Sequence, residues 1–322
     1  MPLIAVFSEG SGIKHYYFGE LMDYTFYRNI KTDTESLLKL LTESFVCKSE
    51  TAQLFKEKVL KHSNIFVSLK DNEPSFALIG VPVEINTGSE ELKGVYIIPA
   101  VKNEGLKIEH KDEIAAWLSE ISNHFSAECL VFSPNDDAVS VIFSELGFKN
   151  SFTEKILKIS KYSAKVLASK DEVTTDKLSF THFDELSHKF KGAFIKWNND
   201  LFEYFVKSLE TAGGEALSLS SGGDVKGYIF GKKSGCIGSI FESVGDGSVL
   251  SFALSRIARD EEILECEIFL PLSYPFSADN MDVVSGAMIK PLSEKAENAL
   301  SKAPLYFGYS PFRRILYSSR MK

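Results

Sequence analysis

One segment constrains the architecture more than any other, and it runs from Asn135 to Phe148 as NDDAVSVIFSELGF. Asn135 is a good helix N-cap, and the two aspartates after it place negative charge where the helix dipole favours it. Apolar residues then recur at steps of three and four, which marks one face of a helix. Gly147 ends this helix, and Phe148 begins the next segment. An apolar run at 129–132 precedes Asn135 and predicts a buried strand.

Three further elements are expected upstream of that strand, between residues 93 and 125. The first is a strand over 93–98, because KGVYII is rich in β-branched and aromatic residues. The second is a loop with a single glycine, which reads PAVKNEGLK at 99–107. The third is a helix whose apolar residues form one stripe: Ile114, Trp117, Leu118, Ile121 and Phe125.

This order of elements, with the Asn-capped helix and its Gly-Phe exit, resembles the late part of the GNAT superfamily, the acyl-CoA-dependent N-acetyltransferases. The family's loop has a basic residue or Gln, two residues, Gly, one residue, then Gly or Ala. Here Lys102 and Gly105 stand at the first and fourth positions, whereas Lys107 departs from the pattern at the sixth. The resemblance covers roughly residues 23–160. It implies an α/β (α+β) fold, a mixed and mostly antiparallel sheet flanked by helices.

The resemblance also implies acetyl-CoA as the acyl donor. A glycine-bearing turn that opens a helix directs unpaired backbone N–H groups at one spot, and in the family that spot holds the pyrophosphate of CoA. Lys107 either crowds the diphosphate or swings aside and supplies a charge-assisted contact. Glu104 repels phosphate unless it points away. The implied cofactor-binding residues are Ile97, Ile98, Lys102, Gly105, Leu106, Lys107 and Asn135.

Acetyl transfer from a thioester needs a neutral amine, a donor for the oxyanion and a proton for the departing thiolate. In the family a tyrosine on the late helix often supplies that proton, and the match places Phe143 there. Phenylalanine cannot donate a proton. Tyr96, on the strand beside the loop, is the candidate catalytic substitute, and its alternative role is that of a core or cross-strand aromatic. No Ser/His/Asp or Cys/His arrangement stands at a motif spacing.

Composition limits the class of protein. The net charge of −8 argues against a sequence-independent nucleic-acid binder. A local basic cluster is sufficient for CoA, and Lys102, Lys107 and Lys111 either form one or lie on a solvated helix face. We expect an amine acceptor that is a small molecule or a peptide, and no nucleic-acid or membrane partner. The oligomeric state cannot be inferred from the sequence.

The cysteines and the N-terminal segment point to one compartment. The four cysteines are scattered without a C-x-x-C pair, which fits a reducing environment and gives no metal signature. The N-terminus lacks a basic segment followed by a long apolar one, and no apolar run reaches the length of a membrane span. A cytoplasmic location is therefore expected.

The length of 322 residues predicts two domains of ordinary size. We expect an N-terminal hairpin extension over 1–22, a first GNAT-like domain over 23–162 and a second, degenerate one over 175–322. In the second domain the pattern predicts helices at 183–194, 201–209 and 248–258 and a last strand at 283–289. Such tandem domains resemble multidomain bacterial acetyltransferases of the enhanced-intracellular-survival type. Their sterol-carrier-like domain is not expected, because the chain ends too soon.

The second half contains its own loop candidate, Glu242–Gly247, with glycines at 245 and 247 between a strand and a helix. Its charge is wrong for phosphate, since Glu242 replaces the basic position and Asp246 lies between the glycines. We therefore interpret it as a turn, and this half as structural or as one wall of an acceptor cleft. Two hypotheses stay open for the whole chain: an acetyl-CoA-dependent N-acetyltransferase, or a catalytically inactive GNAT-like binding module.

Overall fold

The computed structural model describes residues 5–6, 13–17, 23–27, 34–45, 49–70, 73–101, 110–133, 137–168, 173–188, 193–245, 247–271 and 281–302. The elements of the first half are β1 (Ala5–Val6), β2 (Ile13–Tyr17), β3 (Asp23–Tyr27), α1 (Thr34–Phe45), α2 (Ser49–Lys58), the 3₁₀ turn η2 (Leu60–His62), β4 (Asn64–Lys70), β5 (Glu73–Asn86), β6 (Glu91–Val101), α3 (Lys111–Phe125), β7 (Cys129–Phe132), α4 (Asp137–Glu145) and β8 (Lys149–Ser160).

The second half begins with a helix and contains the remaining elements. They are α5 (Lys161–Leu167), β9 (Thr174–Lys177), α6 (Phe180–Ser187), β10 (Phe194–Lys196), α7 (Asn199–Thr211), β11 (Gly214–Ser221), β12 (Asp224–Ser234), β13 (Ile237–Gly245), α8 (Gly247–Arg259), β14 (Glu265–Pro271), β15 (Met281–Pro291) and α9 (Glu294–Lys302).

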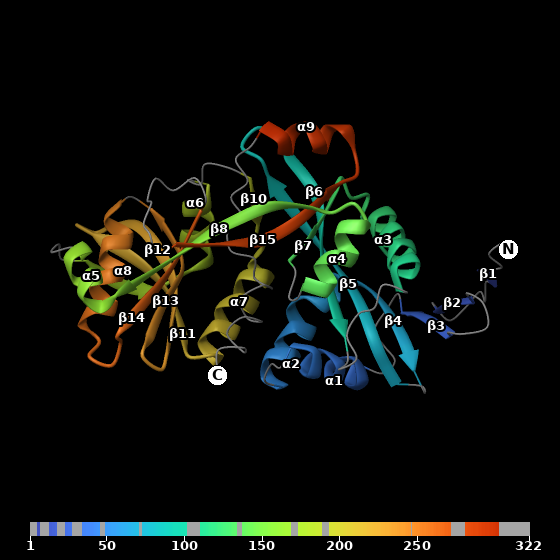
Figure 1. Ribbon diagram of the computed structural model, residues 1–322, viewed down its shortest axis with the longest axis horizontal. Helices are drawn as coiled ribbons and strands as arrows, with labels where there is room; N and C mark the ends of the chain where they lie inside the picture. Colours follow the sequence, from blue (N-terminus) through green and yellow to red (C-terminus); the bar gives the residue numbers. More distant parts are fainter. Residues whose placement is uncertain are drawn as a thin grey trace.

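The two halves share two strands. Sheet neighbours follow the order β1-β2-β3-β4-β5-β6-β7-β15-β8-β14-β13-β12-β11-β9. β15, from the end of the chain, therefore lies between β7 and β8 of the first half, and β8 pairs with β14 of the second half. Figure 1 shows β8 and β15 running side by side from one half to the other. The fold is thus two α/β sheets of mixed direction, joined by the exchanged strands β8 and β15.

Helices cover both faces of the first sheet. On one face α3 and α4 bury Ile121 and Phe143 against Val95 and Ile97 of β6. The opposite face belongs to a second core, to which α1, α2 and α7 contribute. Figure 1 shows α7 of the second half beside α2 of the first, and the two helices are in contact. The second half packs against the first through this face as well as through the exchanged strands.

Most predicted elements are present, and two details differ. The helix expected over 183–194 occupies 180–187 instead, and Phe194 belongs to the short strand β10, which pairs with Ile85 and its neighbours in β5. Residues 161–167 form α5 with Ala164 buried, so a helix runs across residue 162, the expected end of the first domain. In the N-terminal segment β1 pairs with β2 in antiparallel direction, and β2 in turn pairs with β3. The domain boundaries stay a prediction, because β8 and β15 serve both sheets.

Candidate functional site

The candidate site lies where β6 and β7 part. The two strands pair in parallel from Gly94–Cys129 to Ile97–Phe132, and there β7 ends. β6 continues to Val101, paired only with β5 within the described residues. One edge of β6 is therefore without a strand partner from Ile98 onwards. This opening is at the carboxyl end of parallel strands, where α/β sheets place their ligands.

A buried hydroxyl lies at this opening. Ser133 follows the last residue of β7 and is 5% exposed, yet its Oγ has no hydrogen-bond partner among the residues that the structure describes. Burying a hydroxyl without a partner costs free energy, so such groups are rare in folded proteins. An amide or carbonyl group of a bound ligand would satisfy it. Sequence reasoning missed Ser133, although it is the first polar residue after an apolar strand.

The backbone of β6 presents acceptors at the opening. The N–H of Lys93 donates to Glu128 Oε2 (2.9 Å) and its carbonyl accepts from the Glu128 N–H (2.8 Å), so Lys93 faces the β7 side. Backbone groups alternate along a strand, and the β5–β6 register has no shift. Pro99 therefore also faces the opening, without an N–H to offer. The N–H of Val101 already donates to Ser44 Oγ (2.9 Å).

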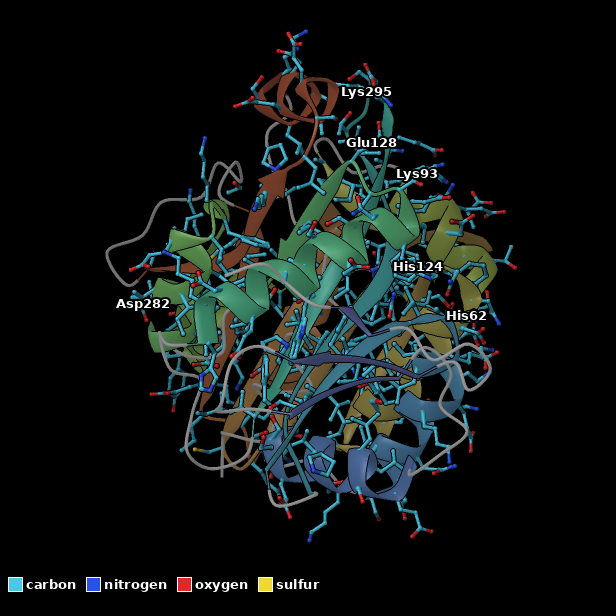
Figure 2. All side chains as sticks on the ribbon, turned by 90° about the vertical axis from the view of Figure 1, so that its right-hand side faces the viewer. His62, Lys93, His124, Glu128, Asp282 and Lys295 are labelled. Carbon is cyan, nitrogen blue, oxygen red and sulfur yellow. The ribbon has the colours of Figure 1, made fainter. Side chains whose placement is uncertain are left out.

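The start of β7 is held by an ion pair. Glu128 accepts a hydrogen bond from Lys295 of α9 (2.8 Å), and Figure 2 shows Lys295, Glu128 and Lys93 along one side of the molecule. The hydrogen bond from Lys295, then that from the Lys93 N–H, lowers the pKa of the Glu128 carboxyl. This ion pair thereby links α9, which belongs to the second half, to the start of β7, the strand on one side of the opening.

The candidate residues are placed as follows. Ile97 and Ile98 flank the point where the strands part, and their side chains are buried in the cores on opposite faces of the sheet. Tyr96 pairs with Val131, and its side chain is 2% exposed in the same core as Ile98. The remaining cofactor candidates lie outside the described residues: Lys102, Gly105, Leu106, Lys107 and Asn135.

Phe143 is a core residue. Its side chain is fully buried and stacks on Phe132, with ring centroids 3.9 Å apart and planes 16° from parallel. Phe148 meets it edge-on at 5.1 Å. Gly147 has φ +89°, and the Phe148 N–H donates to the Phe143 carbonyl (3.0 Å), so the predicted glycine exit is confirmed. The aromatic at the family's tyrosine position thus serves packing.

The corresponding turn of the second half is filled. Only Asp246 separates β13 from α8. A Cβ on Gly245 would lie 2.5 Å from the Lys226 carbonyl oxygen and 2.6 Å from Val249 Cγ2. Glu242 is buried and accepts a hydrogen bond from Tyr228 Oη (2.5 Å). Val249 and the Lys226 carbonyl therefore crowd the backbone at Gly245, and the buried Glu242 stands where the resemblance implies a basic residue, so this turn suits a diphosphate poorly.

Thiol and metal chemistry find little support in the described part of the chain. Burial raises the pKa of the Cys129 thiol to about 12 and that of the Cys266 thiol to about 11, so both stay protonated near neutral pH. The described residues contain no group of three or more His, Cys, Asp or Glu side chains able to hold a metal ion. Among those residues, too, no helix is long and apolar enough to span a bilayer.

Solved structures resemble this fold, whereas no family model and no curated protein matches the sequence. The GCN5-related N-acetyltransferase from Anabaena variabilis is 14% identical, with a TM-score of 0.66 over 84% of this chain and 73% of its own. Eis1 from Mycobacterium abscessus is 10% identical, with a TM-score of 0.61 over 87% and 76%. A tandem GNAT protein from the clavulanic acid biosynthesis pathway is 11% identical, with a TM-score of 0.52 over 81% and 96%. This chain therefore has the tandem GNAT fold.

Proposed function

We propose that the protein is an acetyl-CoA-dependent N-acetyltransferase that acts on a small amine or a peptide amine. One observation carries the proposal: beyond Ile97 one edge of β6 lies beside the Ser133 hydroxyl, and neither has a partner on that side within the described ranges of this tandem GNAT fold. The opening belongs to the first half, where the loop at 102–107 follows β6. The second half lacks the space.

Acetyl-CoA would supply the activated acetyl group as a thioester. In the proposal the backbone of β6 around Ile97 and Ile98 aligns the pantetheine arm. Lys102, Gly105, Leu106 and Lys107 receive the pyrophosphate, and Asn135 caps the following helix at the same end. Ser133 contributes its hydroxyl to a cofactor amide or carbonyl. These roles follow from the resemblance and from the position of β6 and β7.

The reaction also needs a hydrogen-bond donor for the oxyanion of the tetrahedral intermediate. Because Pro99 lacks an N–H and that of Val101 is engaged by Ser44, β6 offers no free amide donor there. We infer that the donor comes from the segment 102–109 or from Ser133 Oγ. Tyr96 stays our candidate for protonating the thiolate, and Tyr96→Phe should then lower kcat with little change in cofactor affinity.

A thermal shift with acetyl-CoA tests the proposal. At 100 times its Kd the cofactor adds about 2.7 kcal/mol of stability. Gly105→Trp should abolish this shift, because the indole fills the space against the backbone. Gly88→Trp is the matched control: it lies in the β5–β6 turn with open space around its Cβ position, so the shift should persist. No shift at millimolar acetyl-CoA would overturn the proposal.

The second candidate is a binding module without turnover. Phe143 cannot donate a proton, and β6 lacks the free N–H that would polarise the acetyl carbonyl. A panel of amines separates the two: thiol release that depends on an amine supports the enzyme. A clear acetyl-CoA shift with no release from any amine supports the module.

A further inference from the structure

A second gap in the sheet lies along β5, on the edge that faces away from β6. β5 pairs with β6 along one edge, and along the other edge with β4 as far as Gly80 and with β10 from Glu84. Residues 81–83 have no strand partner on that edge within the described residues. Pro82 sits in the middle, and a proline suits an unpaired edge because it has no N–H to leave unsatisfied.

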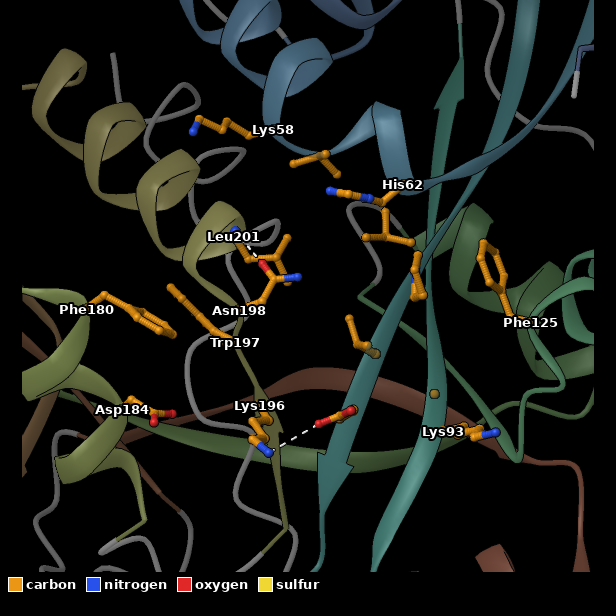
Figure 3. Close-up of a pocket in the computed structure, with 16 residues that line it drawn as sticks. Lys58, His62, Lys93, Phe125, Phe180, Asp184, Lys196, Trp197, Asn198 and Leu201 are labelled. Carbon is orange, nitrogen blue, oxygen red and sulfur yellow. Dashed lines mark hydrogen bonds and ion pairs between the residues drawn. The ribbon is translucent and has the colours of Figure 1, made fainter. Parts of the chain in front are cut away.

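The gap opens into a cavity of about 590 Å³, which is the size of a small-molecule site. Figure 3 shows η2 and β5 on one side and the β10–α7 junction with α6 on the other. Gly94 of β6 lines the cavity, whereas the candidate cofactor opening begins after Ile97. Gly94 and Ile98 are four positions apart along the strand, a distance of about 13 Å.

The cations at the cavity are already engaged. Lys58 pairs with Glu203 (2.5 Å) and Asp200 (3.3 Å), and Lys196 pairs with Glu84 and Glu91 (both 3.3 Å). Figure 3 shows Lys93 directed away from Trp197 and Lys196. An anionic ligand would have to compete for Lys58 or Lys196 with carboxylates of the protein.

Asp184 is the lining carboxylate that can still accept a charge-assisted hydrogen bond from a ligand. Within the described residues its one ion-pair contact is His188 Nε2 at 3.9 Å, which carries charge only when the imidazole is protonated. Figure 3 shows Asp184 beside Phe180 and Trp197, on the same side of the cavity. Aromatic faces attract cations, so this corner combines a carboxylate with two rings.

Buried rings and one hydrogen-bonded carboxyl lie behind the aromatic wall. The Trp197 ring lies 5.0 Å from that of Phe183, which lies 5.3 Å from that of Tyr228. Tyr228 in turn donates to the buried carboxyl of Glu242. Glu84 and Glu91 together carry one more negative charge than the Lys196 that joins them. The lining thus combines apolar and aromatic side chains with two carboxylates, Glu84 and Asp184, and two of its lysines, Lys58 and Lys196, are already paired with carboxylates.

We propose that this cavity binds a small organic ammonium ion with an apolar or aromatic body, held by Asp184 against Phe180 and Trp197. The site is separate from the acetyl-CoA opening and does not depend on the proposed reaction. It joins the two halves of the chain, because η2 and β5 come from one and α6, β10 and α7 from the other.

Isothermal titration calorimetry with 2-phenylethylamine tests this, with 3-phenylpropionate as the anion of similar shape. The amine should bind saturably at one site and the carboxylate should not. Asp184→Asn should weaken the amine at least about tenfold, since a charge-assisted hydrogen bond is lost. Lys196→Met should strengthen it several-fold, because Glu84 and Glu91 lose their counter-ion. Asp224→Asn, an exposed carboxylate on β12 paired with Lys226, is the matched control and should change nothing.

Three outcomes would each overturn the inference. The amine does not bind, the carboxylate binds as tightly as the amine, or Asp184→Asn leaves the affinity for the amine unchanged. Gly105→Trp separates it from the proposed function. That variant should lose the acetyl-CoA shift and keep the amine. If acetyl-CoA fails to bind while the amine still binds, the cavity stands and only the reaction is lost.

Discussion

The β6–β7 and β13–β14 pairs occupy corresponding places in the two halves. Each is a parallel pair with four residues in register, and each first strand runs on past the last paired residue. A helix follows in both cases, α3 after β6 and α8 after β13. In outline both halves could hold the same ligand.

The connections to those helices make the difference. Residues 102–109 lie between β6 and the turn that starts α3, whereas Asp246 alone separates β13 from α8. The short connection forces Gly227, Gly245 and Val249 together: a Cβ on Gly227 would come within 2.0 Å of the Val244 carbonyl oxygen. Two parallel strands that diverge are therefore not sufficient for a cofactor site. The connection from the first strand to the next helix must also leave space for the ligand.

The largest expected effect comes from cutting the chain between its two halves. A fragment of residues 1–168 contains β7 and β8 but lacks β15, the strand between them. β7 would lose its partner on one edge and β8 its partners on both, because β14 is missing as well, and such unpaired edges aggregate. We expect the fragment to be unfolded or aggregated in circular dichroism and size-exclusion chromatography.

Co-expression with residues 169–322 is the control. It should restore a folded complex, since the cut falls outside both exchanged strands. A soluble, cooperatively folded fragment 1–168 on its own would contradict the exchange as a requirement for the first sheet.

The next effect concerns the filled turn of the second half. Gly245→Val introduces side-chain atoms where Lys226 and Val249 already lie, at a φ of +141° that L residues rarely adopt. Overpacking and backbone strain together should cost about 3 kcal/mol or more in unfolding free energy, measured by urea denaturation.

Gly222→Ala separates strain from crowding. Its φ is +62°, but no atom lies within 4 Å of the added Cβ. It should cost about 1–2 kcal/mol. Equal losses in the two variants would mean that the turn has room after all, and the contrast between the halves would weaken.

Local pattern was enough to predict the helices and strands around the opening. The stripe of Ile114, Trp117, Leu118 and Ile121 is buried as expected, because a 3.6-residue period maps directly onto one helix face. Gly147 ends α4 as predicted, since its φ of +89° is a property of the residue type.

The pairing of strands that lie far apart in the sequence could not be predicted in this way. β15 was expected as a strand, but periodicity carries no information on which strands it would join. β10 is three residues long, too short for alternation, and is stabilised by pairing with β5 more than a hundred positions away. The cavity at Asp184 and Trp197 depends on that pairing. Ser133 became a candidate only when its burial without a partner was known.

A smaller effect is expected from changing Phe143, the buried aromatic residue of α4. Phe143→Tyr would bury a hydroxyl between Phe132 and Phe148, where it should cost about 1–3 kcal/mol of stability and give no gain in turnover. Urea denaturation and an acetyl-CoA turnover assay measure both. Tyr96→Phe, also a buried ring, is the companion variant. A rise in turnover with Phe143→Tyr would show that the ring reaches the cofactor.

The smallest effect is at the contact between the halves outside the sheet. Asp200 of α7 meets Lys61 (2.7 Å), Lys58 (3.3 Å) and His62 (3.3 Å) of the first half. Hydrogen bonding from Lys61 is the main cause that lowers the pKa of the Asp200 carboxyl from 3.8 to about 2. A depressed pKa stabilises the folded state above the unfolded value, and that stability is lost as the pH falls through the folded one.

Asp200→Asn should therefore cost about 1 kcal/mol at neutral pH, because these charges are partly exposed, and the difference from the natural sequence should vanish between pH 4 and pH 2. Denaturation at a series of pH values measures it. Asp176→Asn, which removes a carboxylate with no ion pair in the described structure, should show no such dependence. A loss that persists unchanged at pH 2 would assign the contact to hydrogen bonding and packing, and the halves would then be joined without help from charge.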